Sequence, residues 1–233
     1  MATKGGKLFT EAELKEMGVE TINLIDQAID ARDLEKTKKL AHRMHNEFFA
    51  QHEDLRDWIA SLLSFVQRRL GDEAVYEAVH ETFSQFSPLF VTYHSQDIRR
   101  KVQMLAAGFR GHLTSLIIEE DGEKFTLMMT PCGSGGRAIR NNSYSPPKNF
   151  AKIRKPHKMT YGRADFPVYC AHCAVQDIVP IEMTGYPVWV IDVPEKVGEE
   201  PCRYHIYKDP DKIPEKYYKR YGLKKPTPKS KTM

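Results

Sequence analysis

The four cysteines are the residues of this sequence best suited to chemistry. Cys170 and Cys173 form a C-x2-C pair, whereas Cys132 and Cys202 stand alone and each follows a proline. Thiolates at such spacing can bind one metal, and a helix start at the pair would favour the deprotonated form. Four converging thiolates suit zinc or an iron–sulfur cluster. We therefore predict one shared metal centre, with buried neutral thiols and a redox dithiol as alternatives.

The string C-G-S-G-G-R, from Cys132 to Arg137, could hold a ligand. Its glycines allow the backbone to approach a ligand closely and to turn its N–H groups toward an anion, and Arg137 could grip a carboxylate or phosphate. We predict that a small anionic organic molecule binds here. The predicted substrate-binding residues are Gly133, Ser134, Gly135, Gly136 and Arg137. A nucleophilic Cys132 beside its own backbone amides, or a plain turn after a strand, remain alternatives.

Histidines supply candidate proton carriers. His45 and His52 lie two turns apart beside the apolar face of a predicted long helix, and His157 lies in the segment that precedes the cysteine pair. We predict a catalytic role for these three, with His45 as the first choice, while half-buried structural histidines are the alternative. His172 lies between the paired cysteines and His205 lies three residues after Cys202. Like His157, either could also replace a cysteine as a ligand or act as a proton carrier.

Charge is distributed unevenly along the chain. The net charge is +4, yet residues 132–164 carry eight basic and no acidic residues, and residues 216–233 carry seven and none, which leaves 4 − 15 = −11 on the remainder. Such segments can attract an anionic ligand or can be solvated. Tyrosines interleave with the basic residues near the C-terminus, but no RNP, KH or helix-turn-helix pattern accompanies them. Association with nucleic acid is therefore only the second alternative function.

The first half of the chain predicts helices. Thr10 and Glu13 have the spacing of a capping box, and apolar residues recur at helical spacing behind them. A long helix is predicted over residues 34–70, with an apolar arc from Met44 to Val66 and Gly71 at its end.

The second half predicts strands. Residues 113–119 and 124–130 are rich in β-formers and flank Asp121-Gly122, which is a hairpin signal. A second strand pair is predicted at residues 188–193 and 203–207. We predict an α+β fold in which an N-terminal helical half packs on a small antiparallel sheet with cysteine-bearing loops.

We predict a single domain over residues 1–233, with a helical half at 10–110, a sheet and cysteine half at 111–210 and a basic tail at 211–233. Hydrophobic residues make up 41% and charged residues 28%, which excludes a disordered chain. No apolar run has membrane-spanning length, and the first residues have no apolar signal region. We therefore expect a cytoplasmic protein without a membrane partner, and a homo-oligomer stays open.

The helical half with His45 and the L-G-D-E-A turn (Leu70 to Ala74), followed by a small sheet with cysteine-bearing segments, resembles the L-2-amino-thiazoline-4-carboxylic acid hydrolase family. This resemblance in layout covers the middle of the chain and implies a hydrolytic, small-molecule function. The P-C-G-S-G-G-R and Y-C-A-H-C strings are not assigned to that family, so no catalytic residue is carried over. We predict a metalloenzyme of hydrolase or lyase type, with a non-enzymatic small-ligand sensor containing a structural metal as the first alternative.

Overall fold

The computed structural model describes residues 8–227, and its elements group into two units, Met1–Asp54 and Leu55–Met233. The long helix α3 (Leu34–Leu70) contributes to both units, with the bounds predicted from the sequence. Gly71 follows it with a φ of 93°, a backbone conformation that glycine adopts without strain. Each unit is described separately below, and the predicted single domain over residues 1–233 stays a prediction.

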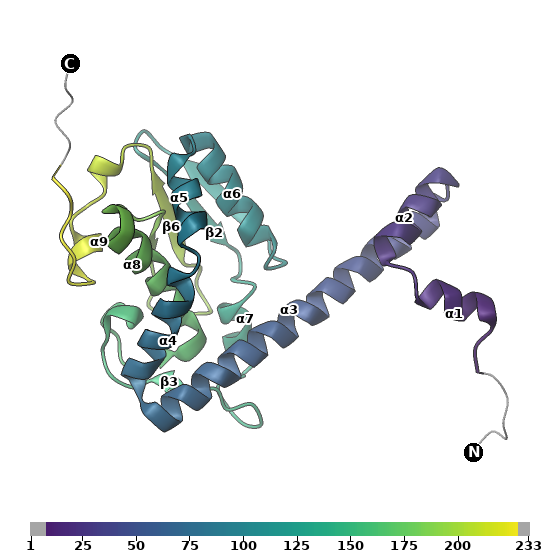
Figure 1. Cartoon of the computed structure of the whole chain (residues 1–233), viewed down its shortest axis with the longest axis horizontal. Helices are drawn as coiled ribbons and strands as arrows, with labels where there is room; N and C mark the ends of the chain where they lie inside the picture. The colour runs from purple at the N-terminus through teal and green to yellow at the C-terminus, as the bar shows by residue number, and fades with distance from the viewer. Residues whose placement is uncertain (1–7, 228–233) are drawn as a thin grey trace. The chain divides into compact units, whose positions relative to one another are not determined.

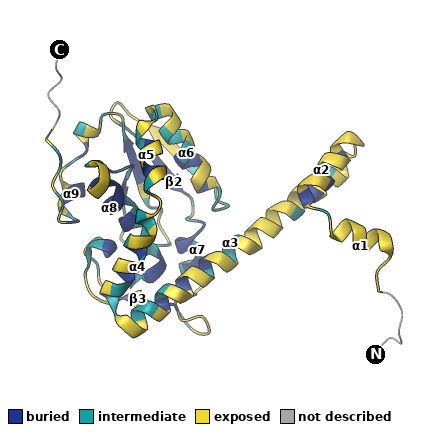
Figure 2. Cartoon of the chain, viewed as in Figure 1, coloured by how far each residue is buried: buried dark blue, intermediate teal, exposed yellow. Residues whose placement is uncertain are grey.

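The first unit holds α1 (Glu11–Met17), α2 (Thr21–Asp30) and the N-terminal part of α3. The predicted capping box at Thr10 is confirmed, because Thr10 and Glu13 each accept the other's backbone N–H. A small core of Leu24, Ile25, Ala28 and Leu40 holds α2 against α3. Most other side chains of this unit are exposed, as the yellow ribbon of α1 and α2 shows (Figure 2).

The second unit contains the remaining elements (Figure 1). Its helices after α3 are α4 (Asp72–Ser84), α5 (Ser87–Ser95), α6 (Ile98–Arg110), α7 (Gly135–Arg140), α8 (His172–Thr184) and α9 (Lys216–Lys219). Its strands are β1 (Leu116–Glu120), β2 (Lys124–Met129), β3 (Lys152–Ile153), β4 (Phe166–Pro167), β5 (Val190–Asp192) and β6 (Arg203–Tyr207). Short 3₁₀ helices occur at η1 (Lys158–Thr160), η2 (Val168–Ala171) and η3 (Pro210–Lys212).

The main sheet is antiparallel and has the order β1-β2-β6-β5, while β3 and β4 form a separate pair. The predicted hairpin is confirmed, since β1 and β2 pair across the turn at Asp121. The carboxylate of Asp121 accepts the backbone N–H groups of Glu123 and Lys124 at 2.8 Å, which closes this turn. Mixed helices and a small antiparallel sheet make the fold α+β, as predicted.

The sheet is covered by α6, which packs Leu105 and Phe109 against Leu127 and Tyr204. The rings of Phe109 and Tyr204 meet edge to face with their centroids 4.4 Å apart. The larger core surrounds α8, which lies beside α4 and α5 (Figure 1). The buried part of α8 contributes Val175, Ile178 and Val179 to this core, and its buried Asp177 pairs with Arg220 at 2.6 Å.

In the described part of the chain, no helix combines the length and the apolar character that crossing a membrane requires.

Candidate functional site

The second unit contains a partly open cavity of about 770 Å³. Its walls come from the C-terminal part of α3, from α4, α5 and α6, and from the first turns of α7 and α8. Most of the lining is carbon, contributed by side chains such as Leu63, Phe83, Phe90, Met104 and Trp189. These helices are joined by short connections, so a stretch of chain from residue 59 to residue 112 forms much of the wall.

All four cysteines line this cavity. Cys132 follows β2, Cys170 lies in η2, Cys173 lies in the first turn of α8, and Cys202 precedes β6. The sequence places these thiols up to 70 residues apart, and the fold brings them to one cavity wall. None of the four forms a disulfide.

Burial keeps these thiols protonated at neutral pH. Burial raises the pKa of Cys132 above the ordinary value of a thiol, and it raises the pKa of Cys173 to about 11. The pKa of Cys170 is raised chiefly by burial and further by the three neighbouring thiols. A thiolate here would lose hydration without gaining a cation, which is why the neutral form is favoured.

The predicted thiolate-bound metal centre is contradicted. Within residues 8–227, no group of three or more histidine, cysteine, aspartate or glutamate side chains is arranged to hold a metal ion. The reason is geometric, because the thiols are not grouped for shared coordination and two of them make local contacts instead. Cys132 accepts the Gly136 N–H at 3.4 Å, and Cys173 lies 3.7 Å from the Tyr204 hydroxyl. This finding contradicts the predicted metalloprotein function at a thiolate-bound centre, whereas zinc or an iron–sulfur cluster as a cofactor stays a prediction.

The glycines after Cys132 allow tight packing at the thiols. A Cβ atom on Gly135 would lie 2.7 Å from the Cys170 sulfur, and one on Gly136 would lie 2.7 Å from Cβ of Cys132. A Cβ on Gly133 would come within 2.1 Å of the His112 carbonyl oxygen. A larger residue at Gly135 or Gly136 would therefore force α7 or the neighbouring cysteine to shift.

Only some of the five predicted substrate-binding residues line the cavity. Ser134, Gly135 and Gly136 line the cavity, and the Ser134 hydroxyl donates to the Tyr169 hydroxyl at 2.9 Å. Gly133 and Arg137 are not among the lining residues. The guanidinium of Arg137 instead donates to the carbonyls of His112 at 3.0 Å and Leu113 at 3.1 Å, which ties α7 to the chain that follows α6.

The three predicted proton carriers lie elsewhere. His45 and His52 belong to the first unit, where His45 is exposed and its Nδ1 lies 3.4 Å from the Asn46 side chain. His157 belongs to the second unit and caps η1, because its Nδ1 accepts the Met159 N–H at 3.2 Å. None of the three lines the cavity.

Two other lining residues carry polar groups next to a thiol, His172 and Tyr204. His172 lies within the C-A-H-C string, so its position between the two cysteines was the available sequence signal. Tyr204 had no such signal, because its register opposite Leu127 brings it there only through the pairing of β2 with β6.

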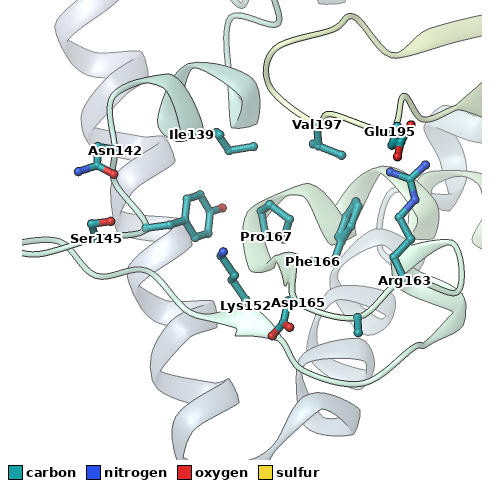
Figure 3. Close-up of a pocket in the computed structure, with 12 residues that line it drawn as sticks. Ile139, Asn142, Ser145, Lys152, Arg163, Asp165, Phe166, Pro167, Glu195 and Val197 are labelled. Atoms are coloured by element: carbon teal, nitrogen blue, oxygen red, sulfur yellow. The ribbon is translucent and has the colours of Figure 1, made fainter.

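A second, smaller cavity of about 390 Å³ lies nearby in the same unit (Figure 3). Figure 3 shows Asn142 and Ser145 on one side of it and Arg163 and Glu195 on the other. The Arg163 guanidinium donates to the carbonyls of Pro194 at 2.6 Å and Val193 at 2.8 Å. Part of the basic segment therefore holds backbone in place.

Comparison of the chain with family models, with curated proteins and with solved structures gives no match. The resemblance to the hydrolase family in layout stays a prediction.

Proposed function

We propose that the second unit binds an uncharged, largely apolar small molecule in the 770 Å³ cavity. The carbon-rich wall of this cavity is the observation that carries the proposal. Cavities that take small ligands typically measure about 300–1,000 Å³ and combine apolar walls with a few polar groups. The volume and the composition found here both fall within that description.

The charges around the cavity favour a neutral ligand over the anion suggested by the basic segment. Neither lysine nor arginine is among the described lining residues, and Glu200 is their one carboxylate. An anion would therefore lose its hydration and meet no cation, which is strongly unfavourable in an apolar site. An apolar ligand gains free energy by leaving water.

A few polar groups could orient such a ligand. The lining includes the Ser134 hydroxyl, the Gln176 amide and the Tyr204 hydroxyl, together with the thiols. A ligand with one polar end would place that end among these groups and its apolar part among the helices. This polarity distinguishes the proposed site from a simple packing defect, since an apolar void lacks such donors and acceptors.

Binding of Nile red, an uncharged apolar fluorophore, tests the proposal on the full chain. The blocking variant is Ala78→Phe, because Ala78 is half-buried and lines the cavity. The matched control is Ala107→Phe, since Ala107 is exposed on α6 and is not a lining residue. We expect saturable binding to the wild-type chain, a loss of at least about tenfold in Ala78→Phe, equivalent to ~1.4 kcal/mol, and little change in Ala107→Phe.

The control separates the cavity from the exposed apolar surface of the helices. Equal Nile red affinity in the wild-type chain and Ala78→Phe would overturn the proposal, since the probe would then be bound outside the cavity. Absence of saturable binding to the wild-type chain would overturn it as well. Thermal unfolding of both variants verifies that each is folded.

A further inference from the structure

His172 and Cys173 form a contact pair in the lining of the cavity. Nδ1 of His172 lies 2.5 Å from the Tyr169 carbonyl oxygen, and Nε2 lies 3.6 Å from the Cys173 sulfur. A carbonyl oxygen can only accept, so Nδ1 carries the hydrogen. In this neutral ring Nε2 carries no hydrogen, and its lone pair faces the Cys173 thiol.

The histidine ring is held in this orientation by packing. It lies edge to face with Tyr169, with the centroids 4.8 Å apart, and stacks on Phe83 at 6.1 Å. Burial lowers the pKa of His172, which keeps the imidazole neutral and able to accept a proton. A cysteine is activated by a neighbouring base that a third group orients. Here these are Cys173, His172 and the Tyr169 carbonyl.

The thiol needs such a base. Burial raises the pKa of Cys173, so without help the thiol stays protonated at neutral pH. A second group lies on its other side, since the Tyr204 hydroxyl is 3.7 Å from the same sulfur. Burial holds the pKa of Tyr204 well above its usual value, so its hydroxyl keeps a proton and can donate to a negative charge formed beside it. All three side chains line the cavity.

We infer that Cys173 and His172 catalyse acyl transfer from esters whose acyl group is apolar and occupies the cavity. This inference rests on the proposed function, because the cavity supplies the acyl-binding site. The substrate class follows from the wall: the Cys173 thiol lies beside His172 and Tyr204, and the acyl carbons would lie among apolar lining residues such as Phe90 and Met104. The inference differs from the prediction that the cysteines bind a metal, and it makes Cys173 the nucleophile in place of Cys132.

The reaction has two steps. The Cys173 sulfur attacks the ester carbonyl carbon while its proton passes to Nε2 of His172, and the ester C–O bond breaks as that proton passes to the leaving oxygen. The products are an alcohol and an acyl thioester on Cys173. Water then attacks the thioester carbonyl, releases a carboxylic acid and restores the thiol, so the sum is ester plus water giving acid plus alcohol. The Tyr204 hydroxyl is placed to stabilise negative charge during either step.

The experiment uses the full chain and p-nitrophenyl octanoate, with p-nitrophenyl acetate as the short-chain comparison. Nitrophenolate release reports the first step, and mass spectrometry of peptides locates the acyl group. We expect octanoate to be preferred and the octanoyl group to be found on Cys173. Cys173→Ala should abolish the adduct, and His172→Gln should slow its formation by at least about 100-fold, the usual contribution of a general base.

Two further measurements control for indirect effects. Peptide mapping of the wild-type adduct distinguishes Cys173 from the other thiols in the same cavity. His80→Gln should leave the rate unchanged, because His80 of α4 bonds Glu182 of α8 and does not line the cavity. Thermal unfolding checks each variant. If His172→Gln does not fold, the test depends on Cys173→Ala, which removes a single sulfur atom and should abolish the adduct.

Failure of this inference can be told apart from failure of the proposed function. Nile red binding with no adduct on Cys173, or with an adduct that persists elsewhere at the same rate in Cys173→Ala, would overturn the acyl-transfer inference and leave the binding proposal intact. Absence of Nile red binding would overturn the binding proposal. An adduct on Cys132 in the wild-type chain would return the nucleophile to that residue and also overturn the inference.

Discussion

The two cavities of the second unit are neighbours with opposite chemistry. Both are lined by Phe166 and Val197, yet the larger has a carbon-rich wall with four thiols, and the smaller is lined by two cations and two anions. The charged residues of the smaller cavity are Lys152, Arg163, Asp165 and Glu195. Phe166 and Val197 thus border both a site suited to a neutral ligand and a polar depression.

This difference shows that residues close together in the sequence can line different cavities. The glycines after Cys132 and the basic residues beyond them belong to one acid-free segment, and together they suggested an anion site. In the fold, Gly135 and Gly136 line the large cavity, whereas Lys152 and Arg163 line the small one. The positive charge and the close backbone approach therefore act in different places.

The largest effect is expected where the two cavities share a lining side chain, Phe166. Phe166 is 3% exposed and packs its ring against Tyr161. Phe166→Ala should lower the free energy of unfolding by about 3–5 kcal/mol, because it removes buried carbon and leaves a void that joins the two cavities. Urea unfolding measures the loss. Phe166→Leu should lose clearly less, and a loss below about 1 kcal/mol in Phe166→Ala would show that the ring does not form the wall.

A smaller effect is expected at the thiol end of the large cavity. In Gly136→Ala the new Cβ would meet Cys132, so α7 or the thiol must shift, and we expect a loss of about 1–3 kcal/mol in the free energy of unfolding, typical of overpacking. Gly122→Ala is the matched control, because no atom lies within 4 Å of its Cβ position. Denaturant unfolding of both variants gives the comparison, and equal stabilities would contradict the close packing at Cys132.

The smallest effect is expected outside both cavities, at Asp192. The His205 ring N–H bonds this carboxylate at 3.1 Å, and the Tyr217 hydroxyl donates to it at 3.0 Å. These hydrogen bonds, led by that from His205, lower the pKa of Asp192 to about 2. Since the folded pKa lies below the unfolded value of about 3.9, ionised Asp192 stabilises the fold above about pH 4, and this contribution is lost as the pH falls toward 2.

Asp192→Asn should therefore lower the free energy of unfolding at pH 6 by about 1 kcal/mol or less, because the half-exposed carboxylate is partly screened by water. Its stability should also fall less steeply than that of the wild-type chain between pH 4 and pH 2. Unfolding curves measured across that range provide the test, with Glu195→Gln as an exposed acid of the small cavity. Nile red affinity should stay unchanged in both, and an identical acid dependence in Asp192→Asn and the wild-type chain would refute the assignment.

Local interactions made several elements predictable. The capping box at Thr10, the long helix over Leu34–Leu70 and its end at Gly71 depend on residues a few positions apart. The hairpin of β1 and β2 follows from the turn at Asp121, whose hydrogen bonds close within three residues. The same reasoning gives the α+β class, because helical and strand periodicities occupy different halves of the chain.

The candidate site was not predictable in the same way. The sequence identified the four thiols as a set, but whether they bind a metal depends on distance and burial, which arise from packing between segments far apart in the chain. The tertiary structure made the thiols neutral, bonded Arg137 to two carbonyls, and turned His172 toward Cys173. It also left a cavity among the helices, whose apolar residues in the sequence resembled those of a filled core. Residue spacing fixes short-range geometry, whereas volume, hydration and pKa are properties of the whole packed interior.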